Sequence, residues 1–118
     1  MSAAANQALA HAWIDAFNAH DVPRLVALYA EACTHTSPKL RAAGGEGCIR
    51  GKAALTTWWQ GAMQAMPSLR YELLTVTASD ARVFIEYTRH CDGQAPMAIA
   101  EVFDVANGLI TASRVFHG

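Results

Sequence analysis

The 118 residues of the chain have the composition of a folded domain, with 16% charged and 53% hydrophobic residues and a net charge of −1. This balance excludes a disordered or strongly charged tail, and the sequence has neither a basic stripe for nucleic acid nor an apolar run for a membrane. The beginning of the chain lacks the pattern of a signal peptide. We therefore expect a single cytoplasmic domain over residues 1–118.

Three cysteines, Cys33, Cys48 and Cys91, form neither a disulfide framework nor a zinc motif, because their number is odd and no CxxC spacing occurs. A metal site built from His35, His117 and Glu101 is chemically possible, since two histidines and a carboxylate form a known ligand set. The sequence has no tight spacing motif for such a site, so we expect no metal.

Two amphipathic helices are predicted at the start of the chain. Leu9, Trp13 and Phe17 recur every four residues and place one apolar stripe against a core. Asp21 is the expected N-cap of the second helix, over residues 22–29.

A short strand over residues 33–37 is predicted next, and Pro38 prevents its continuation. Residues 39–51 are expected to form a long flexible connection. This connection holds Gly44, Gly45, Gly47 and Gly51. A third helix is predicted over residues 52–65 and ends at Pro67.

The second half of the chain is predicted to be all strand. Four strands are expected, over residues 69–77, 82–91, 96–106 and 109–117. Asp92-Gly93 and Asn107-Gly108 separate the later strands and are strong hairpin signals. Three helices followed by an antiparallel meander predict an α+β fold, a curved sheet with helices on its concave face.

The strand over residues 96–106 contains an unexpected charge. Its odd positions are Met97, Ile99, Glu101, Phe103 and Val105, which alternation places on one face. A carboxylate on a hydrophobic face is costly unless it is paired, neutralised by a raised pKa, or used in chemistry. Glu101 is therefore the first candidate for function.

Several segments resemble the nuclear transport factor 2-like superfamily. They are Trp13–Asp21, Leu25–Ala30, Gly51–Leu55, Met66-Pro67 and the ending from Asn107. Together they cover nearly the whole chain and are most similar to the SnoaL-like branch of small polyketide cyclases, with ketosteroid isomerase a more distant relative. The resemblance implies a cone-shaped, cystatin-like sheet of five or six strands around three N-terminal helices, with a pocket between sheet and helices.

The resemblance also implies a homodimer through the outer face of the sheet. Ala98, Ala100 and Val102, the even positions beside Glu101, are small and apolar and fit such an interface. Alternatively, these residues pack under another element of the same chain.

Comparison with ketosteroid isomerase argues against that particular activity. Glu101 matches the strand position where the isomerases hold a protonated acid. Their general base lies just before a proline, where this chain has Ser37, and their pocket tyrosine matches Trp13. Two of the three parts are missing, so steroid isomerisation is not expected.

The resemblance and the strand alternation together define the expected pocket. Its polar residues are His35, Tyr71, Tyr87, Arg89, Glu101 and His117, and its walls are Trp13, Trp58, Trp59, Ile99 and Phe103. The inward direction of His117 depends on the loop at Asn107-Gly108. A strict two-residue loop would pair Glu101 with Arg114 and turn His117 outward, whereas a three-residue loop with a bulge would turn it inward, and we favour the second.

Two functions remain open. The first is an acid–base enzyme without a cofactor, in which Glu101 and His117 are the acid and base and Arg89 or Tyr87 binds an oxyanion on a small apolar carbonyl substrate. Its reaction would be a cyclisation, an isomerisation, or a hydration or dehydration. The second is a non-catalytic ligand-binding or dimerisation module. Under a structural alternative, Glu101 only forms an ion pair with Arg89 or Arg114.

Overall fold

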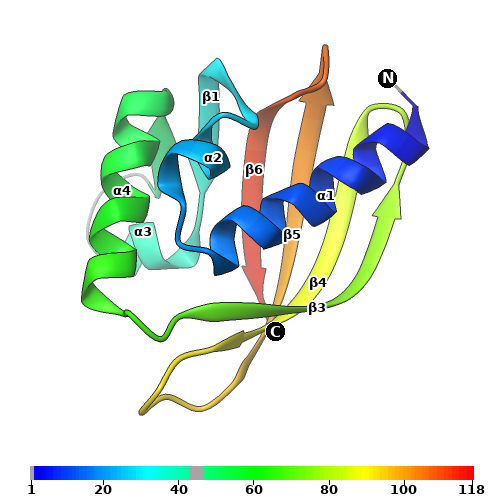
Figure 1. The fold of residues 1–118 in the computed structure, drawn as a ribbon. Helices are drawn as coiled ribbons and strands as arrows, with labels where there is room; N and C mark the ends of the chain where they lie inside the picture. Colours follow the sequence, from blue (N-terminus) through cyan, green and yellow to red (C-terminus); the bar gives the residue numbers. More distant parts are fainter. Residues whose placement is uncertain (1, 43–46) are drawn as a thin grey trace.

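The computed structural model describes residues 2–42 and 47–118. Within them, four helices and six strands follow the chain in the order α1 (Ala3–Asn18), α2 (Val22–Val26), β1 (Tyr29–Thr36), α3 (Pro38–Ala42), β2 (Cys48–Arg50), α4 (Lys52–Ala65), β3 (Arg70–Ala78), β4 (Arg82–His90), β5 (Met97–Ala106) and β6 (Leu109–His117). The strands form one curved sheet in the order β2-β1-β6-β5-β4-β3 (Figure 1). This arrangement confirms the predicted α+β class.

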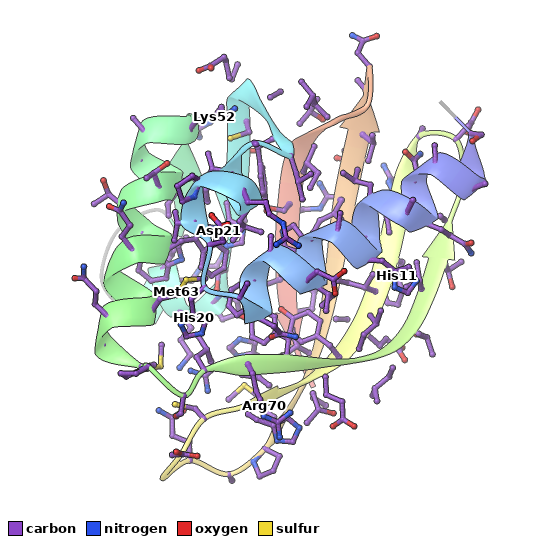
Figure 2. The ribbon with its side chains drawn as sticks, viewed as in Figure 1. His11, His20, Asp21, Lys52, Met63 and Arg70 are labelled. Carbon is purple, nitrogen blue, oxygen red and sulfur yellow. The ribbon has the colours of Figure 1, made fainter. Side chains whose placement is uncertain are left out.

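Helices α1, α2 and α4 cover one face of the sheet (Figure 1). Helix α1 is capped by the Ser2 side chain and buries the stripe that contains Trp13 and Phe17, as its periodicity predicts. The Nε2 atom of His20 lies 2.6 Å from the carbonyl oxygen of Leu69, which ties the end of α1 to the start of β3. Figure 2 shows His20 beside Met63, whose buried side chain belongs to α4.

Strands β4 and β5 alternate as their sequences predict. Along β4, Val83, Ile85, Tyr87 and Arg89 are buried and most residues between them are exposed. Glu101 shares the buried face of β5 and is 0% exposed. The predicted position of this carboxylate among apolar residues is therefore confirmed.

The first strand is longer than its sequence indicates. Helix α2 ends at Val26, and β1 begins at Tyr29, which the periodicity placed on the second helix. The backbone N–H of Ile110 donates to the carbonyl of Leu28 at 2.9 Å, and Tyr29 pairs with Ile110 in β6. Pairing with a distant strand therefore overrides the local helical pattern. The β1–β6 pair is parallel, whereas the other strand pairs among the described residues are antiparallel.

The prediction of a flexible connection over residues 39–51 is wrong for the part of it that the structure describes. Helix α3 occupies its start, and β2 pairs with residues 34–36 of β1. The N–H of Gly51 also donates to the carbonyl of Cys33 at 2.8 Å. Pairing with β1 gives this segment a regular structure, which its high glycine content does not predict. Gly44 and Gly45 lie outside the described residues.

The β5–β6 connection gives the expected register through a different geometry. Asn107 and Gly108 form a two-residue turn with φ of 53° and 78°, and the register shift follows within β6, opposite Asp104 and Val105. Glu101 consequently pairs with Val115 instead of Arg114. The bulge is present as predicted, but it lies in the strand and the loop keeps two residues.

Candidate functional site

A small cavity of about 50 Å³ lies between the inner face of the sheet and α4. The sheet side and the β1–α3 junction contribute His35, Ser37, Lys39, Tyr71, Tyr87, Arg89, Ile99, Val115 and His117. Helix α4 contributes Trp58, Trp59 and Ala62, and the connection from α4 to β3 contributes Met66 and Leu69. The walls are therefore mainly apolar and aromatic, with a few polar groups facing inward, which is the usual composition of a small-molecule site.

Tyr87 connects the cavity to the buried carboxyl group of Glu101. Its hydroxyl lies 2.8 Å from Oε1 of Glu101, and its ring stacks on Tyr71 with centroids 4.2 Å apart. Oε2 of Glu101 is buried and has no hydrogen-bond partner among the described residues. Burial raises the pKa of Glu101 to about 8, against a smaller lowering by the Tyr87 hydroxyl. Glu101 is therefore mostly protonated at neutral pH.

Glu101 itself does not line the cavity, because Tyr87 stands between the two. The pKa values of Tyr71 and Tyr87 are also raised, mainly by burial and to a smaller extent by the negative charge of Glu101. Both phenols therefore stay protonated. The cavity is therefore lined by the two phenols, and Glu101 is connected to it only through the Tyr87 hydroxyl.

A chain of hydrogen bonds fixes the ring of His35. Trp13 donates its indole N–H to the Tyr29 hydroxyl at 3.1 Å, that hydroxyl lies 3.3 Å from the Ser113 Oγ, and the same Oγ lies 2.6 Å from His35 Nδ1. An indole nitrogen can only donate. If each hydroxyl then donates onward, Nδ1 of His35 is the acceptor and Nε2 carries the proton.

Burial lowers the pKa of His35 to about 4, so its ring is neutral at pH 7. In the tautomer that accepts from Ser113 at Nδ1, the Nε2–H is the group that the ring can offer to a ligand oxygen. His35 is therefore better suited to donate a hydrogen bond than to act as a base.

Arg89 is 4% exposed and lies at the end of the cavity nearest the β4–β5 loop. Its Nη1 donates to Oε1 of Gln94 at 2.7 Å, and its Nη2 donates to the sulfur of Met66 at 3.1 Å. The sequence-based alternative of an ion pair with Glu101 is wrong, because Glu101 bonds to Tyr87. The other possible partner, Arg114, bonds to Asp104 at 2.8 Å.

His117 lies on the inner side of β6, opposite Ile99, and is exposed at the mouth of the cavity. Its pKa is lowered by partial burial and by the positive charges of Lys39 and Arg89. A histidine that is neutral and reachable by solvent can accept a proton, and His117 is the lining residue that best meets this requirement.

The structure brings most of the predicted pocket residues together and excludes three. His35, Tyr71, Tyr87, Arg89, Trp58, Trp59, Ile99 and His117 line the cavity. Trp13, Phe103 and Glu101 do not, and all are 0% exposed. The Trp13 ring lies 5.5 Å from the Phe17 ring and 5.8 Å from the Tyr71 ring, and those two rings stack on each other at 3.8 Å, so Trp13 belongs to the core beneath the site.

Sequence reasoning missed two polar lining residues, Ser37 and Lys39. Ser37 was considered only as a substitute for a catalytic base, and Lys39 was placed in a connection without structure. Ser37 joins β1 to the short helix α3, Lys39 lies in the first turn of that helix, and this junction brings both to the cavity. Only the proline after β1 gave a local sign that the chain changes direction here.

Neither a metal cluster nor a membrane helix is found in the described part of the chain. Over residues 2–42 and 47–118, no three histidine, cysteine or acidic side chains lie together as ligands. Among the same residues, no helix is long and apolar enough to cross a membrane.

The chain is thus an α+β domain in which a curved sheet and a helix enclose a mainly apolar cavity lined by two phenols. Residues 10–113 match the SnoaL-like domain family, and the chain belongs to that family. No curated protein sequence matches the chain significantly.

Solved structures agree with this assignment. A SnoaL-like protein of unknown function from Burkholderia thailandensis is 27% identical, with a TM-score of 0.87 over 100% of this chain and 98% of that one. A candidate polyketide cyclase from Sinorhizobium meliloti is 17% identical, with a TM-score of 0.77 over 92% and 93% of the two chains. A candidate ketosteroid isomerase from Kribbella flavida is 18% identical, with a TM-score of 0.81 over 98% and 79%. The last two likenesses show the nuclear transport factor 2-like fold alone.

Proposed function

We propose that this protein is a cofactor-independent acid–base enzyme that removes a proton next to a carbonyl group of a small, largely apolar substrate. The observation that carries the proposal is the Tyr87–Glu101 pair, a phenol at an apolar cavity backed by a carboxyl group whose pKa is about 8. A neutral acid in an apolar site can support a developing oxyanion without adding a negative charge.

Either Tyr87 or Glu101 can be the donor in the hydrogen bond between them, depending on the protonation state of Glu101. When Glu101 is ionised, Tyr87 donates to it and has no proton left for a ligand. When Glu101 is protonated, it can donate to the Tyr87 oxygen across the same 2.8 Å, and the phenol proton can then be given to the neighbouring Tyr71 hydroxyl or to a ligand in the cavity. The raised pKa of Glu101 favours the second arrangement at neutral pH.

His117 is proposed as the base. It would take the proton from the carbon beside the carbonyl, while Tyr87 and the Nε2–H of His35 donate to the carbonyl oxygen as negative charge develops there. Return of the proton to another carbon gives isomerisation, and attack on a second carbonyl gives an aldol product. General acid–base assistance of this kind is typically worth about 100- to 10,000-fold in rate.

The test is exchange of the α-protons of simple ketones for deuterium in D₂O, followed by NMR for cyclohexanone and acetophenone. We expect His117→Gln and Tyr87→Phe each to lower the protein-dependent exchange rate by at least about 100-fold. His11→Gln is the matched control because His11 is exposed on α1 (Figure 2), and its rate should equal that of the natural sequence. Equal rates in all four proteins would contradict the proposed roles.

A ligand-binding module without turnover is the second candidate, and one observation favours it. His117 is exposed, and no hydrogen bond to another described residue fixes its ring in a catalytic orientation. This candidate predicts that ketones and phenols shift the NMR signals of cavity residues, while the protein causes no exchange above buffer.

We also propose a homodimer through the outer face of the sheet. Leu74 and Phe116 are 58% and 53% exposed there, and a shallow hollow includes both of them together with Ala98 and Ala100. Large apolar side chains gathered on one surface favour a covered state. Phe116→Glu should convert a dimer to a monomer in light scattering coupled to gel filtration, whereas Thr57→Glu on the exposed side of α4 should not. A monomeric natural protein would refute the proposal.

A further inference from the structure

We propose that the ligand of this cavity is a small organic carboxylate and that Arg89 binds its carboxylate group. This inference rests on the proposed function for the reaction of the ligand, but the binding itself can be tested separately. Its basis is the position of the Arg89 guanidinium, which is buried beside the cavity and bonded only to neutral groups within the described residues.

A guanidinium has five N–H donors, and the hydrogen bonds of Arg89 to Gln94 and Met66 use two of them. Both acceptors, the Gln94 amide oxygen and the Met66 thioether sulfur, are uncharged. A buried cation without an opposite charge is unfavourable, and its usual partner is a carboxylate bound by two parallel hydrogen bonds. The donors that Gln94 and Met66 leave unused are suited to such a partner.

The acidic side chains of the sheet that could have balanced this charge are engaged elsewhere. Glu101 bonds to Tyr87, and its raised pKa keeps it mostly neutral. Asp104 accepts from Arg82 at 2.9 Å and from Arg114 at 2.8 Å on the outer face. Glu72 lies 2.9 Å from His90. The positive charge of Arg89 is therefore not cancelled by these neighbours.

The rest of the lining also favours an anion. The described residues around the cavity include Lys39 and His117 but no aspartate or glutamate. The three basic groups are close enough for Lys39 and Arg89 to lower the pKa of His117, after the larger effect of burial. A cleft with charge of one sign and apolar walls attracts ligands of the opposite sign.

The strand geometry narrows the substrate class further. Arg89 and Tyr87 lie two residues apart on the same face of β4, a separation of about 7 Å along the strand. A ligand that reaches both therefore carries a carboxylate at one end and a carbonyl oxygen a few bonds away. Trp58, Trp59 and Ile99 would contact the apolar frame between them. The inferred class is that of keto acids on an aromatic or aliphatic frame.

The experiment compares benzoate with benzamide, which has nearly the same shape and no charge, by tryptophan fluorescence and by NMR titration at pH 7. We expect benzoate to bind at least about 10-fold more tightly than benzamide. Arg89→Met should weaken benzoate by about 10- to 100-fold and leave benzamide within about 2-fold, because it removes the charge and keeps an apolar side chain. Arg89→Lys should give an intermediate loss, since an ammonium cannot form the paired bonds.

Two variants at exposed positions test the inference even if the Arg89 variants do not fold. Lys39→Ala at the exposed rim should weaken benzoate by about 2- to 3-fold, and Arg24→Gln on α2 should have no effect. Equal binding of benzoate and benzamide by the natural protein, or no binding of either up to about 10 mM, would overturn the inference. The deuterium exchange of neutral ketones would stand in either case, so failure of the carboxylate site and failure of the acid–base proposal are distinguishable.

Discussion

The replacement Glu101→Gln gives the sharpest test of the buried carboxyl group. The side chain is 0% exposed, and burial raises its pKa from 4.5 to about 8. Between these two pH values the folded protein keeps a proton that the unfolded chain has lost. The free energy of unfolding therefore falls as the pH rises through this window and is constant above it. A glutamine keeps the shape and cannot ionise.

The size of the effect follows from the two pKa values. One unit of pKa difference corresponds to about 1.4 kcal/mol, so ionisation of Glu101 destabilises the fold by about 5 kcal/mol in the alkaline limit. About 3 kcal/mol of this loss falls between pH 6 and pH 9. Domains of this size are stable by only about 5–15 kcal/mol, so the change is large enough to measure.

The assay is urea unfolding followed by tryptophan fluorescence at pH 6, 7, 8 and 9 for the natural protein and for Glu101→Gln. The amide places unpaired donors in a buried site and lowers stability by about 1–3 kcal/mol at every pH, so the quantity compared is the pH dependence alone. We expect the natural protein to lose about 3 kcal/mol more than the variant across this range. Parallel pH profiles would refute a raised pKa at Glu101. Glu101→Met, which adds no donor, should show the same flat profile.

Three further changes test the neighbouring networks. The pKa of His35 is lowered from 6.5 to about 4, so the unfolded chain gains the proton first on acidification and stability falls as the pH drops through that window. His35→Gln should remove about 2 kcal/mol of this acid loss in urea titrations at pH 4.5 and 7. Ser113→Ala should lower stability by about 1–3 kcal/mol at pH 7, because it leaves His35 Nδ1 without a partner, and an unchanged midpoint would contradict the hydrogen-bond chain. Asp104→Asn should cost less than about 1 kcal/mol in thermal unfolding, since its arginine partners are partly exposed, and a larger loss would show that this ion pair is not a surface one.

The alternation of β4 and β5 was predictable because each strand has one solvent-exposed face and one buried face. A period of two places Tyr87 and Arg89 on the apolar face of β4, and Glu101 on the apolar face of β5. The Asn107-Gly108 turn was equally local, since its two residues with positive φ are of the types that tolerate them. Such features depend on neighbours a few residues away.

The partners of the buried polar groups were not predictable. Arg89 and Glu101 share the inner face, but strand pairing places Glu101 opposite Ile85 and Val115, and the Tyr87 hydroxyl reaches it from a neighbouring position on β4. The Ser113–His35 bond joins residues 78 positions apart through the parallel pairing of β1 and β6. A parallel pair requires a long crossover and leaves no turn signal in the sequence.

The sequence by itself determined the α+β class, the hairpin order and the presence of a carboxylate on an apolar strand face, because these follow from periodicity and turn chemistry. Only the tertiary structure decided which groups that carboxylate contacts. In the folded chain Glu101 is buried and bonded to Tyr87, Trp13 and Phe103 lie in the core, and the cavity is lined by the phenols, His35 and Arg89. Burial and hydrogen-bond geometry set the charge of each group, and both depend on contacts between segments far apart in the chain.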